Sequence, residues 1–191
     1  MKKVEISLAT KQRLAMSLKK LMKKKSFDKI TVSELLKDCD ITRPTFYYHF
    51  QDIYALMEWM FETEAIEILK KSGDLVTWED GMLMLSRYVK DNDKVCLCAY
   101  NSLGRRTLER FFFQDTKAVM KNFIDILLKE IPAKPEHVEF IADFYTMAFV
   151  SCLAKWLSDG LKQTPEELIE LIDITMHGNI AEALRRSSKI K

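Results

Sequence analysis

The segment that decides the fold runs from Thr42 to Phe50 and reads Thr-Arg-Pro-Thr-Phe-Tyr-Tyr-His-Phe. Thr42 is a favourable N-cap, and Pro44 suits the first turn of a helix because the N–H that proline lacks would have no partner there. Phe46 and Phe50 are four residues apart, so they share one helical face, which we expect to be buried. The polar and aromatic residues between them then face outward. The sequence predicts a short helix with an exposed outer face.

The residues before this segment predict two more helices and a tight turn. A first helix is expected over residues 7–25, with a serine as its N-cap, leucines on one side and lysines around the rest. A short helix over 31–37 follows, and Thr31 with Glu34 has the spacing of a capping box. Residues 38–41 form the turn. Two short helices joined in this way form a helix-turn-helix, whose second helix can present side chains to the major groove of DNA.

Charge is distributed unevenly along the chain. The net charge of +2 hides an N-terminal quarter, residues 1–52, with 12 lysines and arginines against 6 aspartates and glutamates. Residues 53–191 hold 18 against 22. A basic segment on an acidic body favours a module that binds a polyanion. The alternative is an ordinary solvated helix surface, and charge alone does not separate the two.

The composition predicts an all-α fold of about nine helices. Glycine and proline together number only 9 of 191 residues, which argues against a β-sandwich or a Rossmann sheet. We expect a three-helix DNA-binding domain over residues 1–52 and a larger helical effector and dimerisation domain over 53–191, entered by a linking helix over about 53–71. The other expected helices span about 78–91, 94–103, 105–130, 135–159 and 165–186.

The Thr42–Phe50 segment, with Leu56 after it and Thr31-Val32 and Cys39-Asp40-Ile41 before it, resembles the DNA-binding signature of the TetR family of transcriptional regulators. The resemblance covers about residues 8–56. It implies a homodimer that binds a palindromic double-stranded DNA operator under the control of a small-molecule effector or a protein coregulator. A competing class is a helical protein-interaction adaptor that has lost DNA binding.

The resemblance also implies the contacts that individual residues make. Arg43, Pro44 and Tyr47 are expected to contact base edges. Arg43 is the residue expected to contact a guanine, because a guanidinium group forms two hydrogen bonds with that base. The residues expected to contact phosphates are Thr31, Thr45, Tyr48 and His49. The alternative for both tyrosines is packing against the first helix, and for His49 a surface position without a contact.

Three positions depart from the family pattern. Asp40 replaces the glycine that is usual in the turn, but aspartate tolerates the left-handed conformation. Ser26 replaces a glycine after the first helix. Ile53 replaces a lysine that meets a phosphate, which removes one backbone contact unless Lys29 or Lys11 compensates.

The body is rich in aromatic residues and apolar stripes. By analogy with the family, the residues expected to line an effector pocket are Tyr88, Phe112, Phe144 and Tyr145. The last two helices of the body carry stripes suited to a four-helix dimer interface. The interface residues expected there are Phe149, Cys152, Trp156, Leu168, Ile172 and Met176.

Within the family, two segments are similar to a branch that includes activators of dihydroxyacetone-kinase operons. They are the run from Tyr47 to Leu56 and the sequence Asn101-Ser102-Leu103-Gly104. In that branch a protein coactivator, rather than a small molecule, is sensed.

We expect neither catalysis nor a metal or other cofactor. The three histidines, His49, His137 and His177, stand in no familiar nucleophile or metal-ligand motif. Cys96 and Cys98 are two residues apart, so they do not share a helical face as metal ligands would. The remaining cysteines are expected to be reduced. The start of the chain lacks an export signal and no membrane span is expected, so a cytoplasmic location is predicted.

Overall fold

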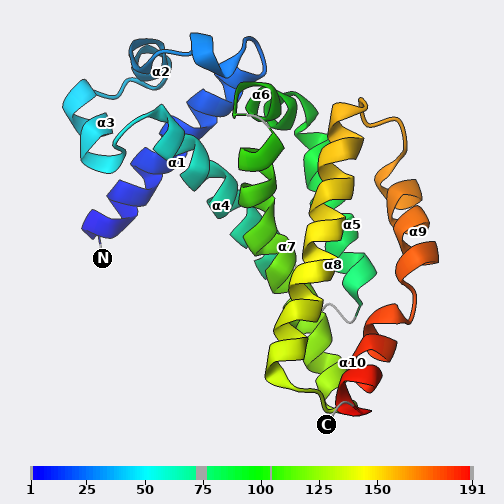
Figure 1. Cartoon of the computed structure of the whole chain (residues 1–191). Coiled ribbons are helices and arrows are strands. Elements are labelled where there is room, and N and C mark those ends of the chain that lie inside the picture. Colours follow the sequence, from blue (N-terminus) through cyan, green and yellow to red (C-terminus); the bar gives the residue numbers. More distant parts are fainter. Residues whose placement is uncertain (1, 72–76, 104, 190–191) are drawn as a thin grey trace. The chain divides into compact units, whose positions relative to one another are not determined.

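The computed structural model describes residues 2–71, 77–103 and 105–189, and all regular elements in these ranges are helices (Figure 1). The expected all-α class is confirmed. The elements are α1 (Lys2–Met22), a 3-10 turn η1 (Phe27–Lys29), α2 (Val32–Cys39), α3 (Arg43–His49), α4 (Ile53–Lys71), α5 (Trp78–Asp91), α6 (Asp93–Leu103), α7 (Arg105–Leu128), α8 (Pro135–Ser158), α9 (Pro165–Met176) and α10 (Asn179–Lys189).

The helices form two compact units. Unit 1 comprises residues 1–64 and 92–108, and unit 2 comprises residues 65–91 and 109–191. The first part of α4 and all of α6 therefore pack with the N-terminal helices. The functional boundary expected between residues 52 and 53 stays a prediction.

Unit 1 is built around the helix-turn-helix. Phe46 of α3 is fully buried, and so are Leu14 and Leu18 of α1 and Leu35 of α2. Asp40 ends α2 in the left-handed conformation, with φ 48° and ψ 50°, as the sequence predicts. The turn therefore keeps its shape without a glycine, because aspartate is one of the few side chains that adopt this region readily.

Local capping interactions fix the ends of the short helices. The Thr31 hydroxyl accepts a hydrogen bond from the Glu34 amide at 3.3 Å, and a Glu34 carboxylate oxygen accepts one from the Thr31 amide at 3.1 Å. The predicted capping box is thereby confirmed. The Asp52 carboxylate caps α4 by accepting from the Ala55 amide at 2.8 Å. Ser26 has φ −61°, which any residue adopts, so the missing glycine there has no conformational consequence.

The packing of α6 in unit 1 is not visible in the sequence pattern. Its residues Val95, Cys96 and Ala99 are fully buried, and α6 contacts α1 and η1. The Cys98 thiol donates to the Lys25 carbonyl at 3.4 Å. Burial raises the pKa of the Cys96 thiol to about 12, so that thiol is inert.

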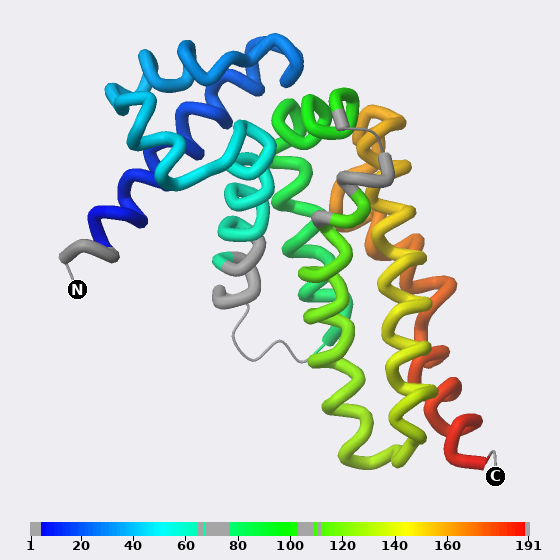
Figure 2. The backbone as a smooth tube through the Cα atoms, turned by 60° about the vertical axis from the view of Figure 1, so that its left-hand side comes forward, coloured from blue at the N-terminus to red at the C-terminus, as the bar shows by residue number. Residues whose placement is uncertain are grey.

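Unit 2 is a helical bundle in which α7 and α8 run antiparallel (Figures 1 and 2). Lys117 of α7 forms ion pairs with Glu139 and Asp143 of α8, at 2.5 and 2.6 Å. Helix α5 packs on α9, and α10 packs on α8. Among the described residues, α8 is the helix long and apolar enough to cross a membrane, but half of its most apolar window is buried inside the structure, as in the core helix of a soluble protein.

Three expected local features differ from the structure. The first helix begins at Lys2, so Ser7 lies inside it, because residues 2–6 contain nothing that breaks a helix. The single helix expected over 165–186 is two helices, since Gly178 adopts φ +70° and ends the helical path after α9. Thr42 stands at the N-cap of α3, but its hydroxyl makes no cap bond to the backbone.

The inner face of α3 should carry much of the stability of unit 1. We expect Phe46→Ala to lower the free energy of unfolding by about 3–5 kcal/mol, because it opens a cavity in a closed core. The matched substitution Tyr48→Ala on the outer face should change it by less than about 0.5 kcal/mol. Urea unfolding followed by circular dichroism measures both, and equal effects would contradict the burial of Phe46.

The capping box predicts an acid-sensitive contribution to the stability of unit 1. The hydrogen bond from Lys25, followed by those from Thr31, lowers the pKa of Glu34 from 4.5 to about 2. A lowered folded-state pKa stabilises the fold above pH 4.5, and this stabilisation is lost as the pH falls toward 2. As the pH falls from 4.5 to 2, the melting temperature should therefore fall less in Glu34→Gln than in the wild type. Glu62→Gln, which removes an exposed carboxylate of α4, is the control and should keep the wild-type slope.

Candidate nucleic-acid interface

The outer face of α3 presents the residues that the sequence predicts to meet base edges. Arg43 and Pro44 are exposed, and the Tyr47 side chain is 49 % exposed. The Arg43 guanidinium carbon lies 5.7 Å from the centroid of the Tyr47 ring, and one guanidinium nitrogen is 3.4 Å from the Tyr47 hydroxyl. The pair is one helical turn apart, so it forms a single patch. Arg43 therefore contacts Tyr47 along the face and remains exposed to solvent.

The residues predicted to contact phosphates lie on α3 and, in the case of Thr31, at the N-cap of α2, and their exposure differs. Tyr48 is 75 % exposed, so packing against α1 does not account for it. The hydroxyls of Thr42 and Thr45 are 2.8 Å apart. The Thr31 hydroxyl is engaged with Glu34, to which it donates at 2.9 Å. A phosphate contact by Thr31 therefore competes with the capping box.

His49 is half-buried at the end of α3, and its ring lies 5.0 Å from that of Tyr48. Burial, and then the charge of Lys11, lower the pKa of His49. The shift favours the neutral form of the imidazole. A neutral imidazole can serve a phosphate as an N–H donor but adds no positive charge.

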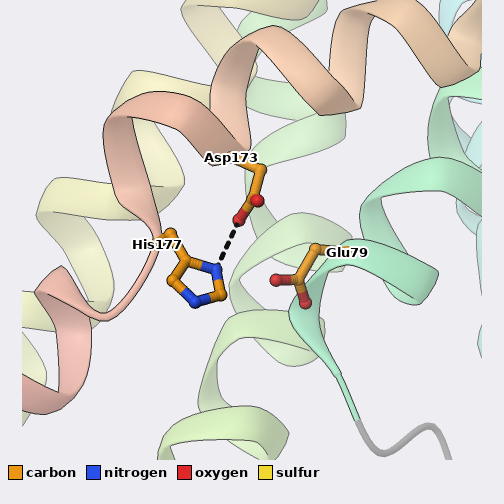
Figure 3. A group of neighbouring side chains, drawn as sticks. All are labelled: Glu79, Asp173 and His177. Atoms are coloured by element: carbon orange, nitrogen blue, oxygen red, sulfur yellow. Dashed lines mark hydrogen bonds and ion pairs between the residues drawn. The ribbon is translucent and has the colours of Figure 1, made fainter.

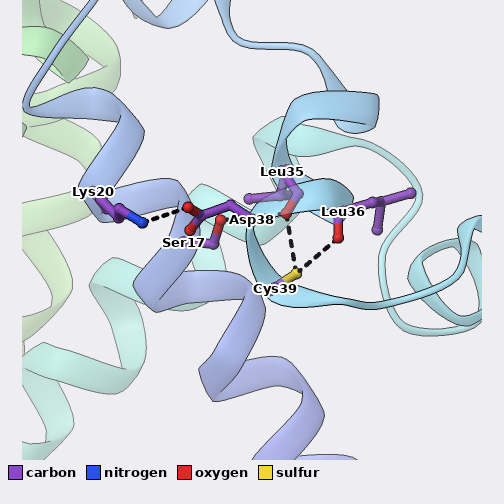
Figure 4. A network of polar contacts seen from close by, with 6 residues as sticks. All are labelled: Ser17, Lys20, Leu35, Leu36, Asp38 and Cys39. Carbon is purple, nitrogen blue, oxygen red and sulfur yellow. Dashed lines mark hydrogen bonds and ion pairs between the residues drawn. The ribbon is translucent and has the colours of Figure 1, made fainter.

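A polar network fixes α2 against α1 and so sets the direction of the turn into α3 (Figure 4). The Ser17 hydroxyl donates to the Leu35 carbonyl at 3.3 Å, and the Cys39 thiol donates to the same carbonyl at 3.1 Å. Lys20 forms an ion pair with Asp38 and lowers the pKa of that carboxyl group. Both helices are held where the turn begins.

Arg13 completes this support by donating to the Cys39 carbonyl at 2.6 Å, which satisfies a carbonyl at the C-terminal end of α2. Sequence reasoning missed these supporting residues. The signal was present, because Arg13, Ser17 and Lys20 recur at spacings of four and three and so form a polar stripe on α1.

Where the family has a lysine at the start of the fourth helix, this chain has a buried apolar residue. Ile53 is buried at the start of α4. The Lys11 ammonium lies over the rings of Phe50 and Trp59, 5.4 and 5.6 Å from their centroids, and its compensation for the missing phosphate contact stays a prediction. Lys29 is exposed.

The four residues predicted to line an effector pocket all lie in unit 2. Phe112 is buried, Tyr88 and Tyr145 are half-buried, and Phe144 is exposed with its ring 5.3 Å from that of Tyr145. The exposed Phe144 ring lies on the surface of the unit. The grooves found in the described part of the chain are lined by other residues, so the effector pocket stays a prediction.

Most residues predicted for the dimer interface line one apolar groove of about 280 Å³ between α8 and α9. Trp156 is not among them, because it is buried and its indole N–H donates to the Gln163 carbonyl at 3.2 Å. The two helices also carry large apolar side chains that are exposed, one of which, Phe144, the sequence predicts for the effector pocket instead. They are Phe140, Phe144 and Met147 of α8 and Leu171 and Ile174 of α9.

Comparison with known proteins agrees with this geometry. Residues 18–60 match the family model of bacterial regulatory proteins of the tetR family, and residues 76–178 match the model of a transcriptional regulator C-terminal region. A curated relative is the HTH-type dhaKLM operon transcriptional activator DhaS of Lactococcus lactis subsp. lactis, 34 % identical over 86 residues. That match covers 45 % of this chain and 46 % of the relative, so the chain spans about half the length of the curated protein it matches.

Two solved structures share the fold. The dihydroxyacetone kinase operon activator DhaS superposes with a TM-score of 0.73 at 23 % identity, over 91 % of this chain and 97 % of that one. The TetR transcriptional regulator from Streptococcus agalactiae 2603V superposes with a TM-score of 0.60 at 21 % identity, over 92 % and 97 % of the two chains. At these identities the likeness concerns the fold alone. The family models, however, cover more than half of the sequence, and the chain therefore belongs to the TetR family of transcriptional regulators.

Proposed function

We propose that this regulator binds a palindromic DNA operator as a homodimer and reads base edges with the outer face of α3. The observation that carries the proposal is the exposed Arg43–Tyr47 pair on a helix whose opposite face is anchored by Phe46. A guanidinium on such a face can pair bidentately with guanine in the major groove. Pro44 lies beside this pair, and Thr31, Thr45, Tyr48 and His49 hold phosphates around it.

A second copy of the chain is the proposed occupant of the α8–α9 groove. The groove is apolar, and five large apolar side chains on these two helices are exposed to solvent. Exposed patches of this kind mark interaction sites in soluble proteins. A two-fold operator also requires two recognition helices, which a dimer supplies. Phe149, Cys152, Leu168, Ile172 and Met176 would form the floor of that interface.

The target proposed for the regulator is an operon for dihydroxyacetone kinase, which it activates in the cytoplasm without being an enzyme itself. The support is the function of the curated relative, a dhaKLM operon activator. A protein coregulator or a small-molecule effector would act through unit 2. Such control requires that the effector bind one state of the dimer more tightly than another.

Titration with duplex DNA tests the main proposal. Operators selected from a random pool should bind with a steep negative slope of log affinity against log salt concentration, above a weaker non-specific background. Arg43→Ala should cost about 1–3 kcal/mol of binding free energy and relax the preference at one base pair per half-site. Arg185→Ala, which removes an exposed cation of α10, should leave the affinity unchanged.

Two results would contradict this proposal. Equal weakening of all sequences by Arg43→Ala would make that residue a phosphate contact. A flat salt profile without sequence preference would favour the protein-interaction adaptor, to which the buried Ile53 in place of a phosphate-binding lysine lends weight.

Sedimentation of single-residue variants tests the dimer. Leu171→Asp places a charge in the α8–α9 groove and should weaken dimerisation at least tenfold, because a buried unpaired carboxylate is costly. The matched change Ile126→Asp, at an exposed apolar residue of α7 outside the groove, should leave the dimer intact. Circular dichroism establishes that both variants are folded. A Leu171→Asp dimer as tight as the wild type would place the interface elsewhere.

A further inference from the structure

Three side chains of the types that can ligate a metal lie together in unit 2, where the start of α5 meets the end of α9 (Figure 3). They are Glu79, Asp173 and His177, and one ligand atom of each lies within 4.8 Å of those of the other two. The group was not expected from the sequence, in which Glu79 and Asp173 are far apart. Helix packing brings them together.

Asp173 and His177 are placed as a pair by α9 itself. They are one turn apart, so their side chains share a face. The His177 amide donates to the Asp173 carbonyl at 2.8 Å and ends the helix, and His177 Nδ1 lies 3.2 Å from Asp173 Oδ1. Gly178, with φ +70°, then redirects the chain. The imidazole is thereby held beside the carboxylate.

Glu79 is brought to this pair by the first turn of α5. The neighbouring Trp78 is buried, and Thr77 caps the helix by accepting from the Asp80 amide at 3.2 Å. Two turns along, Arg87 of α5 donates to Glu166 of α9 at 2.9 and 2.7 Å. The two helices are therefore fixed relative to each other by contacts that do not involve the cluster.

The cluster carries uncompensated negative charge. Two carboxylates face one neutral or singly charged imidazole, and within the described ranges His177 is the partner found for Asp173, while no lysine or arginine pairs with Glu79. Like charges at this separation repel. A bound cation would remove that repulsion.

We propose that Glu79, Asp173 and His177 bind a divalent transition-metal ion, with Zn²⁺ as the best match, and that water fills the remaining coordination positions. Metal bonds to nitrogen and oxygen are about 2.0–2.2 Å long, so two ligand atoms of one ion are at most about 4.4 Å apart. The Asp173–His177 pair already meets this limit at 3.2 Å. The third ligand, the half-buried Glu79, lies within 4.8 Å of both, so a small rotation of its side chain brings it within the limit.

The ligand set distinguishes among ions. An imidazole with two carboxylates suits Zn²⁺, Co²⁺ or Ni²⁺, whereas Mg²⁺ and Ca²⁺ prefer oxygen ligands alone. Bound there, the ion ties α5 to the end of α9, whose residues Ile172, Thr175 and Met176 line the α8–α9 groove. The metal site stands independently of DNA binding, but it stabilises the helix that forms one wall of that groove.

Titration of the tag-free, metal-stripped full chain tests the proposal. Calorimetry with Zn²⁺ should show one ion per chain, and Co²⁺ should give the d–d absorption of a site with a nitrogen ligand. Loss of an outer-shell partner alone lowers metal affinity about 10–100-fold. His177→Ala, Asp173→Asn and Glu79→Gln, which remove ligands, should therefore each weaken binding at least tenfold. Saturating Zn²⁺ should also raise the melting temperature by several degrees in the wild type and not in these variants.

Glu170→Gln is the matched control, because it removes an exposed carboxylate of α9 that lies outside the cluster. It should retain wild-type metal affinity. The proposal is overturned if Zn²⁺ and Co²⁺ show no saturable binding at 100-fold excess over the chain. It is equally overturned if binding survives all three ligand substitutions, or if it is lost only in Cys152→Ser, which would place the ion on the exposed thiol.

Discussion

The surface proposed to face DNA depends on the burial of one side chain. Helix α3 has seven residues, which is too short for a helix to persist on its own in water. Its conformation therefore comes from the core contact of Phe46, supported by Phe50 at its C-cap. Because these rings face inward, the helical period forces Arg43 and Tyr47 onto the exposed face. The side chains available for recognition are thus a consequence of apolar packing.

Features set by local interactions could be predicted from the sequence. The capping box of Thr31 and Glu34 and the left-handed Asp40 depend on residues within one turn of each other, so their signals are complete in a short window. Long-range packing leaves no such signal. The packing of α6 in unit 1 brings Cys98 to the Lys25 carbonyl, a contact across 73 positions that no periodicity reveals.

Helix α8 shows a second reason why the buried residues cannot all be predicted from the sequence. It carries one apolar stripe through Ile141 and Phe149, which the structure buries, and another through Phe140, Phe144 and Met147, which it leaves exposed. Both stripes have helical spacing, and amino-acid type does not tell which one meets the core. The sequence predicts the first stripe for the dimer interface, whereas the second stripe is the one that the structure leaves exposed.

The cluster of Glu79, Asp173 and His177 at the end of α9 depends both on local spacing and on long-range packing. The spacing of Asp173 and His177 is legible in the sequence, but Glu79 joins them only through the packing of α5 on α9. Because α9 also lines the α8–α9 groove, an ion at the cluster and a second copy in the groove act on one helix. Proximity does not by itself couple the two events. Coupling requires that the dimer hold the three ligands at a separation different from that in the monomer. In that case the ion changes the affinity of the dimer by the same factor by which dimerisation changes the affinity for the ion, because linkage is reciprocal.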